Sequence, residues 1–214
     1  MLAGLRLPPD RTTRRITQLT AGLVLFGVSI ALMLTAGLGV PSWDVFHQGL
    51  ALHVPLSFGW VVNIVSLVVL VGWIPLRQSP EVGTIANALT VGIIADLALG
   101  LLSIPASLGG RAVMLGAGVV LNGAATGLYI GAGLGPGPRD GLMTGLASIT
   151  GRSIRSVRTV IEVIVLSAGW LLGGPVGPGT VIYAFLIGPL TQLSLDWFTI
   201  PAASSPPADL KPVP

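Results

Sequence analysis

The sequence predicts an all-α membrane protein with six transmembrane helices and two short re-entrant or interfacial helices, built from two inverted-topology repeats of three spans each. Three observations predict this fold. The chain of 214 residues is 52% apolar and only 9% charged, whereas soluble domains carry about 25% charged residues. One unit of roughly ninety residues occurs twice. The basic residues also gather on one side of the predicted spans.

The repeat is clearest in two segments that lie 96 residues apart, GLGVPSWDVFHQGLA at 37–51 and GLGPGPRDGLMTGLA at 133–147. The same offset aligns Arg15 with Arg111, and GTIANALTVG from Gly83 with GTVIYAFLIG from Gly179. Self-similarity at a fixed offset indicates a duplicated unit. The chain therefore divides into four parts: a basic N-terminus at 1–14, a first repeat at 15–105, a second at 106–200, and a Pro-rich tail at 201–214 that we expect to be disordered and cytoplasmic.

Six apolar runs are long enough to cross a bilayer, because about 20 residues span its hydrocarbon core. Proline and glycine separate them. The runs are 16–36, 56–76, 82–104, 112–134, 157–174 and 179–200. The segments 42–52 and 138–148 are too short to cross as helices. We expect both to be short helices that re-enter the bilayer or lie at its surface.

The basic residues predict the orientation. With the N-terminus in the cytoplasm, ten of the 11 Lys and Arg residues fall inside and only Arg111 falls outside. Both termini are then cytoplasmic. Three spans per repeat is an odd number, so the second repeat enters the membrane in the opposite sense to the first. Such repeats are related by a pseudo-two-fold axis in the membrane plane, as in many secondary transporters.

The motifs GLGVPSWDVFHQGLA, GTIANALTVG, GPGPRDGLMTGLA, VRTVIE and GWLLGGPVGPGT carry a family resemblance. Together they resemble the bacterial YczE/YyaS/YitT family of multi-spanning membrane proteins, particularly its YczE-like branch, over roughly residues 12–200. The resemblance implies a bacterial plasma-membrane protein. It does not supply a mechanism, so function has to be argued from the polar groups.

The repeat singles out Asp44 and Asp140, which occupy equivalent positions in the first turns of the two short helices. Either they accept hydrogen bonds from free backbone N–H groups, or they are gates or cation-binding groups at the two mouths of a pathway. Arg139, next to Asp140, is either a cytoplasmic anchor or a ligand for an anionic substrate at a helix N-terminus. His47 beside the first short helix could titrate near neutral pH.

Asp96 lies inside the third apolar run, and its repeat counterpart is Gln192. Polar residues within spans usually face the bundle interior or water, so this pair predicts a shared internal site. The alternative for Asp96 is a single interhelical hydrogen bond. Asn87, like Asn63 and Asn122, is also within a span, where interhelical hydrogen bonding is the default. Arg158 and Glu162, four residues apart, predict a structural ion pair at the cytoplasmic end of the fifth span.

Several classes of function are disfavoured. The chain has no cysteine, which excludes disulfides and thiolate chemistry. GAGLGPG at 131–137 lacks the Lys-Ser/Thr of a phosphate-binding loop, and no arrangement of residues suggests hydrolysis. We therefore expect no enzyme, no cofactor, no metal site and no nucleic-acid partner, but contact with the lipid bilayer and a small solute.

The leading hypothesis is a small-solute transporter or exporter that works by alternating access. One alternative is a non-transporting membrane factor that supports a partner protein or a biosynthetic complex. Another is a substrate-binding membrane subunit of a larger transporter. Homodimerisation or a partner membrane protein is left open. A polar cleft inside the bundle would favour transport, and solid packing would favour a scaffold.

Overall fold

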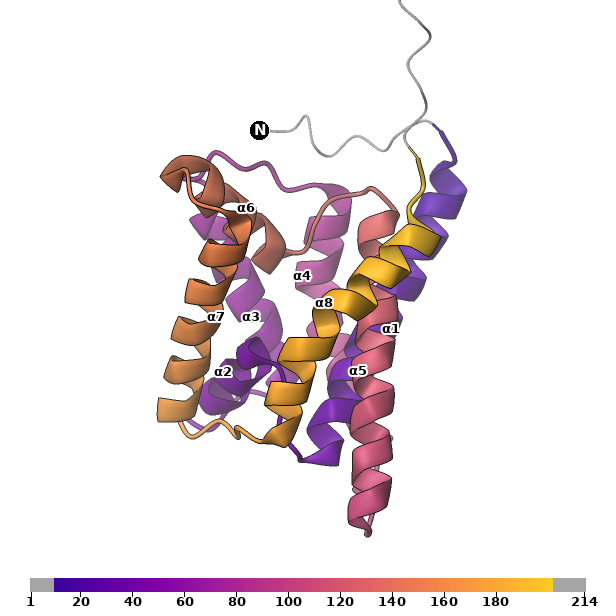
Figure 1. Cartoon of the computed structure of the whole chain (residues 1–214), viewed down its shortest axis with the longest axis vertical. Helices are drawn as coiled ribbons and strands as arrows, with labels where there is room; N and C mark the ends of the chain where they lie inside the picture. Colours follow the sequence, from indigo (N-terminus) through magenta and orange to yellow (C-terminus); the bar gives the residue numbers. More distant parts are fainter. Residues whose placement is uncertain (1–9, 202–214) are drawn as a thin grey trace, which may run out of the picture.

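The computed structural model describes residues 10–201, and this part of the chain folds into eight helices without a strand. In chain order they are α1 (Thr12–Ala36), α2 (Ser42–Ala51), α3 (Phe58–Gly72), α4 (Val82–Leu99), α5 (Leu108–Gly131), α6 (Pro138–Thr150), α7 (Ile154–Leu171) and α8 (Pro178–Phe198) (Figure 1). The all-α prediction is confirmed, and each expected run corresponds to one helix. The expected cytoplasmic tail lies almost wholly outside the described residues.

Helix α1 is at the centre of the packing. It lies along α5 and also packs against α4, while α8 crosses α5 on the other side. Close approach depends on glycine: a Cβ on Gly22 would lie 2.7 Å from the backbone nitrogen of Tyr129, and one on Gly27 would lie 2.9 Å from the carbonyl oxygen of Val91. Small residues at such crossings are typical of helices that associate in membranes.

The outward faces of the bundle carry large apolar side chains. Leu101, Leu171 and Phe185 are among the most exposed, at 87%, 81% and 76%. Exposed apolar surface of this extent would not be stable in water but suits contact with lipid. Four helices are long and apolar enough to cross a membrane: α1, α4, α5 and α8.

The other two predicted spans differ from these four. Helix α3 is apolar but has only 15 residues, and α7 has 18 residues with Arg155, Arg158 and Glu162 in its first half. Six spans therefore remain a prediction.

Contacts recur at the repeat offset. Arg15 on α1 donates from Nη1 to the carbonyl oxygen of Ala132 at the end of α5, at 2.8 Å. Its counterpart Arg111 on α5 donates from Nε to the carbonyl oxygen of Ala36 at the end of α1, at 2.6 Å. Each arginine thus donates a hydrogen bond to an otherwise unpaired carbonyl oxygen at the C-terminus of the first helix of the other repeat.

The loops that follow α1 and α5 also match. Gly37 and Gly133 have φ of 60° and 64°, and Gly39 and Gly135 have φ of 109° and 110°, a region that favours glycine. The backbone N–H of Gly83 donates to Leu134 at 2.7 Å, and that of Gly179 donates to Leu38 at 2.8 Å. Each loop is thereby fixed to the first turn of a helix in the other repeat.

The equivalence breaks down at α3 and α7. Helix α3 packs closely along α4, whereas its counterpart α7 hardly touches α8 and packs instead along α2. A Cβ on Gly92 of α4 would lie 2.1 Å from the carbonyl oxygen of Gly59, but a Cβ on the equivalent Gly188 of α8 would meet nothing within 4 Å. The two repeats have the same elements in different arrangements.

The described ends of the chain meet. Arg15 donates from Nη2 to the carbonyl oxygen of Pro201 at 3.2 Å and to Asp10 at 2.9 Å, which lowers the pKa of the Asp10 carboxyl. Helix α6 lies toward this end of the molecule, and α2 lies in the opposite half (Figure 1). Because residues 10 and 201 lie at the same end of the molecule, the chain between them would cross a membrane an even number of times.

Candidate functional site

A cavity of about 290 Å³ lies inside the bundle, and all eight helices contribute to its wall. The first turns of both short helices reach it, through Ser42 and Trp43 of α2 and through Arg139 and Asp140 of α6. Much of the wall is polar, in contrast to the lipid-facing surface. This is the property that we expect of a solute site rather than of a packed scaffold.

The cavity is built around equivalent positions of the two repeats. Seven pairs of lining residues lie 96 positions apart: Pro41 and Gly137, Ser42 and Pro138, Trp43 and Arg139, Val62 and Arg158, Ser66 and Glu162, Asn87 and Tyr183, and Val91 and Ile187. In each of three pairs the first repeat supplies a neutral residue and the second a charged one. Duplicated positions of the chain therefore form the cavity wall, and later divergence of the two repeats placed charged residues at three of these positions in the second repeat.

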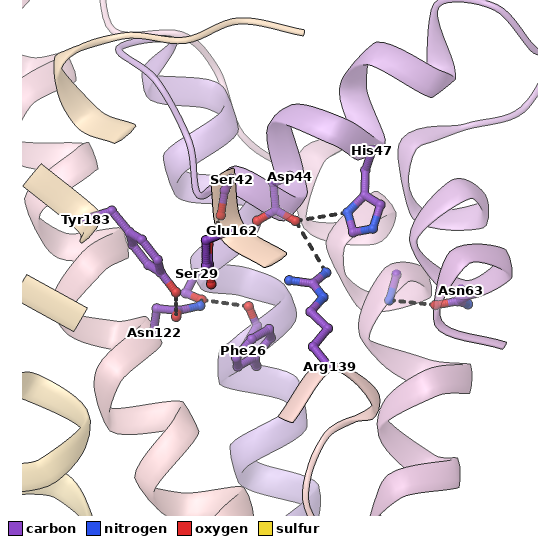
Figure 2. Close-up of polar contacts among 11 residues, drawn as sticks. Phe26, Ser29, Ser42, Asp44, His47, Asn63, Asn122, Arg139, Glu162 and Tyr183 are labelled. Carbon is purple, nitrogen blue, oxygen red and sulfur yellow. Dashed lines mark hydrogen bonds and ion pairs between the residues drawn. The ribbon is translucent and has the colours of Figure 1, made fainter. Parts of the chain in front are cut away.

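The two short helices meet at this cavity through one cluster of side chains (Figure 2). Arg139 of α6 reaches Asp44 of α2, with Nη2 and Oδ1 3.6 Å apart. Its guanidinium lies 5.0 Å from the ring centroid of Trp43, within cation–π range. Trp43 and Arg139 are repeat counterparts, so two equivalent side chains touch each other. The first turns of the two short helices, which carry Asp44 and Asp140, therefore meet at one cavity.

Asp44 and His47 are almost completely enclosed, with 2% and 0% of their side chains exposed. The Asp44 carboxylate lies 3.1 Å from Nδ1 of His47. His47 is thus enclosed by protein and does not itself line the cavity. Its titration near neutral pH stays a prediction.

Asp140 and Glu162 bring negative charge to the cavity. Tyr129 donates its hydroxyl to Oδ2 of Asp140 at 2.8 Å. Glu162 accepts a short hydrogen bond from the hydroxyl of Ser42, and its Oε1 lies 3.8 Å from Nε of Arg158. The expected ion pair between Arg158 and Glu162 is present, but both residues line the cavity and connect α7 to the first turn of α2.

Asparagines join the helices around the cavity. Asn122 donates to the hydroxyl of Ser29 at 2.8 Å and accepts from that of Tyr183 at 2.9 Å. Asn63 donates to the carbonyl oxygen of Leu89 and accepts from the N–H of Gly92, at 2.9 and 3.0 Å. Both form the interhelical hydrogen bonds expected of them. Asn87, the candidate pathway residue, lines the cavity itself.

Asp96 and Gln192 are not brought together. Helix α4 ends at Leu99, so Asp96 lies in its last turn and not in the middle of a long span. There it accepts a hydrogen bond from the N–H of Gly59 at 2.8 Å and a short one from the hydroxyl of Ser57. It thereby caps α3. Gln192 lines the cavity and donates to Asp196 at 3.3 Å.

The cavity extends toward one end of the molecule. Besides the seven pairs, nine residues line it without a lining counterpart, and all but the first belong to the second repeat: Phe26, Thr126, Tyr129, Ile130, Asp140, Met143, Gly188, Thr191 and Gln192. Six of the nine counterparts are at most 2% exposed: Ile30, Met33, Asp44, His47, Ala95 and Asn122. Most of the equivalent positions in the first repeat are therefore packed and do not face the cavity.

Sequence reasoning missed Trp43, Tyr129 and Tyr183 as cavity residues and interpreted Glu162 as a surface partner. For three of them a signal was available, because Trp43, Tyr183 and Glu162 are repeat counterparts of Arg139, Asn87 and Ser66. Position-by-position comparison of the polar residues would have grouped them. Among residues 10–201, no three His, Asp or Glu side chains are placed to hold a metal ion.

The apolar helices around a polar internal cavity define a helical integral membrane protein. The chain belongs to a family of unknown function, DUF6198, which it matches over residues 13–195. It is 37% identical to the uncharacterized membrane protein YczE of Bacillus subtilis over 178 residues, which cover 82% of each chain.

Two further relatives extend this comparison. An uncharacterized protein of Haemophilus influenzae is 35% identical over 86% of this chain and 84% of its own. The uncharacterized protein YyaS of Bacillus subtilis is 28% identical over 80% of this chain and 88% of its own. The YczE-like resemblance is thus confirmed. No solved structure matches the chain.

Proposed function

We propose that the protein is a small-solute transporter of the bacterial plasma membrane that works by alternating access between two inverted repeats. The observation that carries the proposal is the cavity, whose wall contains seven pairs of equivalent positions and whose unpaired lining residues, apart from Phe26, all belong to the second repeat. Transporters with inverted repeats bind their substrates near the repeat interface, where broken helices end.

The reciprocal contacts of Arg15 and Arg111 support inverted repeats. A pair of contacts that exchange partners in this way is expected of two units related by a two-fold axis. With α3 and α7 included as spans, each repeat crosses three times. Helices α2 and α6 are then re-entrant rather than interfacial, because their N-terminal turns meet at one internal cavity and Arg139 contacts Asp44.

The asymmetry of α3 and α7 supports alternating access. If each repeat can adopt the arrangement that the other has, a second conformation follows by exchange. In this second conformation α7 packs against α8, just as α3 packs against α4 in the described one. Helix α3 separates from α4 and packs along α6, just as α7 now packs along α2. The path through the second repeat closes, and the path through the first opens. With both termini in the cytoplasm, the conformation described here faces inward.

Cysteine cross-linking tests this exchange, and the natural chain contains no cysteine to interfere. Ser57→Cys with Asp96→Cys reports the present conformation, because these two side chains are hydrogen-bonded. Ser153→Cys with Gln192→Cys occupies the equivalent positions and reports the exchanged conformation. We expect both pairs to cross-link in membrane vesicles. If the first pair forms a disulfide and the second never does, the protein does not alternate in this way.

A further inference from the structure

The charges of the cavity indicate what kind of solute it would hold. Its wall contains two guanidinium groups, from Arg139 and Arg158, and two carboxyl groups, from Asp140 and Glu162. The formal charges of these four residues cancel, and a further carboxylate, Asp44, lies behind Arg139 outside the wall. Groups of both signs therefore face a bound solute. A solute that carries one charge of each sign can use both.

One part of the cavity has several hydrogen-bond donors that would bind the anionic group of a solute. Neither α2 nor α6 has a side-chain hydrogen bond at its N-cap, Pro41 or Gly137, so the first-turn N–H groups and the helix dipoles favour an anion there. The indole Nε1 of Trp43 supplies a second, independent indication: Trp43 lines the cavity, only 6% of it is exposed, and its N–H has no partner among residues 10–201. A buried donor without an acceptor costs stability that an acceptor atom of a ligand would restore.

Arg139 belongs to the same set. Its guanidinium already lies beside Trp43 and is only loosely paired with Asp44, at 3.6 Å. That distance is longer than the 2.7–2.9 Å of a charge-assisted hydrogen bond. The Arg139 side chain is also 23% exposed and therefore accessible from the cavity. A carboxylate could bind it without breaking a strong internal pair.

Another part of the cavity has carboxylate oxygens that can accept further hydrogen bonds from the cationic group of a solute. Glu162 lies beside Ser42 on the opposite side of the first turn of α2 from Arg139 (Figure 2). Its Oε1 contacts Arg158 only at 3.8 Å, and Arg158 is half exposed. Tyr129 donates to Oδ2 of Asp140, and within residues 10–201 no other side chain donates to that carboxylate. An ammonium group donates three hydrogen bonds and would fit these carboxylates.

We infer that the cavity binds a small zwitterion with one carboxylate and one ammonium group, of the chemical class of amino acids. A volume of about 290 Å³ lies at the lower end of the range of ligand pockets, which suits a solute of this size. Arg139, the helix N-termini and Trp43 hold the carboxylate, and Glu162 and Asp140 hold the ammonium. The inference rests on the proposed function and assigns its substrate class.

Thermal unfolding of the full chain in lipid nanodiscs tests the assignment, with the twenty standard amino acids as probes. For each that raises the unfolding midpoint, the same measurement is made with the amine that lacks the carboxylate and with the acid that lacks the ammonium. For alanine these are ethylamine and propionate. At least one amino acid should raise the midpoint in a saturable way, and its two fragments at the same concentration should not.

Arg139→Gln and Glu162→Gln should each raise the Kd of that amino acid at least tenfold. If Arg139→Gln does not fold, Trp43→Phe, which removes the indole N–H assigned to the same carboxylate, serves in its place. The control variants Arg14→Gln and Asp10→Asn remove the same kinds of charge outside the cavity and should leave the Kd within twofold.

Three results would overturn the assignment: no amino acid stabilises the protein, a fragment binds as tightly as the whole zwitterion, or the cavity variants bind normally. Cross-linking of both cysteine pairs together with any of these results would leave alternating access standing and refute only the substrate class.

Discussion

Two equivalent glycines offer a direct test of the exchange between α3 and α7. At Gly92 an added methyl group would lie 2.1 Å from the carbonyl oxygen of Gly59 and 2.4 Å from Oδ1 of Asn63. At Gly188 it would meet nothing within 4 Å. In the exchanged conformation the two surroundings are interchanged. Gly92→Ala therefore opposes the conformation described here, and Gly188→Ala opposes the exchanged one.

The magnitude follows from the overlap. Forcing an extra carbon into a packed contact costs about 1–3 kcal/mol, which changes the ratio of two conformations by about 5- to 150-fold. Where the methyl group has space, alanine instead favours the helix by up to about 1 kcal/mol relative to glycine. Gly188→Ala should thus keep the thermal stability of the described conformation or raise it.

The assay is the cross-linking rate of the two cysteine pairs in vesicles. In the Gly188→Ala background, the pair at Ser153 and Gln192 should cross-link about 5- to 150-fold more slowly, while the pair at Ser57 and Asp96 is unaffected. In the Gly92→Ala background the effects should be reversed. Unchanged rates for the pair at Ser153 and Gln192 in the Gly188→Ala background would refute the exchange of packing partners.

Two other predictions concern stability and topology. Asp96 caps α3 with two hydrogen bonds. Asp96→Ala should therefore lower the free energy of unfolding by about 1–2 kcal/mol, and Asp96→Asn should lower it by much less. Equal stability of the natural protein and both variants would contradict the capping role. Reporter fusions after residue 78 and at the C-terminus should lie in the cytoplasm and one at Ser107 outside; a C-terminus outside would exclude inverted repeats.

The helices could be predicted from the sequence because apolar runs and proline or glycine breakers act locally. The depth of Asp96 could not. Residues 100–104 read GLLSI and extend the apolar run, but the helix ends at Leu99, and hydropathy does not distinguish an apolar loop from a further helical turn. The repeat predicted equivalent positions for Asp44 and Asp140. It did not predict that Arg139 reaches Asp44, since the distance between α2 and α6 depends on how the two repeats pack together.

The reciprocal arginine contacts also bear on the order in which the protein is made. The carbonyl oxygen at Ala36 is closed by Arg111, which leaves the ribosome 75 residues later. The end of α1 therefore stays incomplete until the second repeat begins to emerge, whereas the end of α5 finds Arg15 already present. The first repeat thus gains this hydrogen bond at its helix end only after translation of the second repeat has begun.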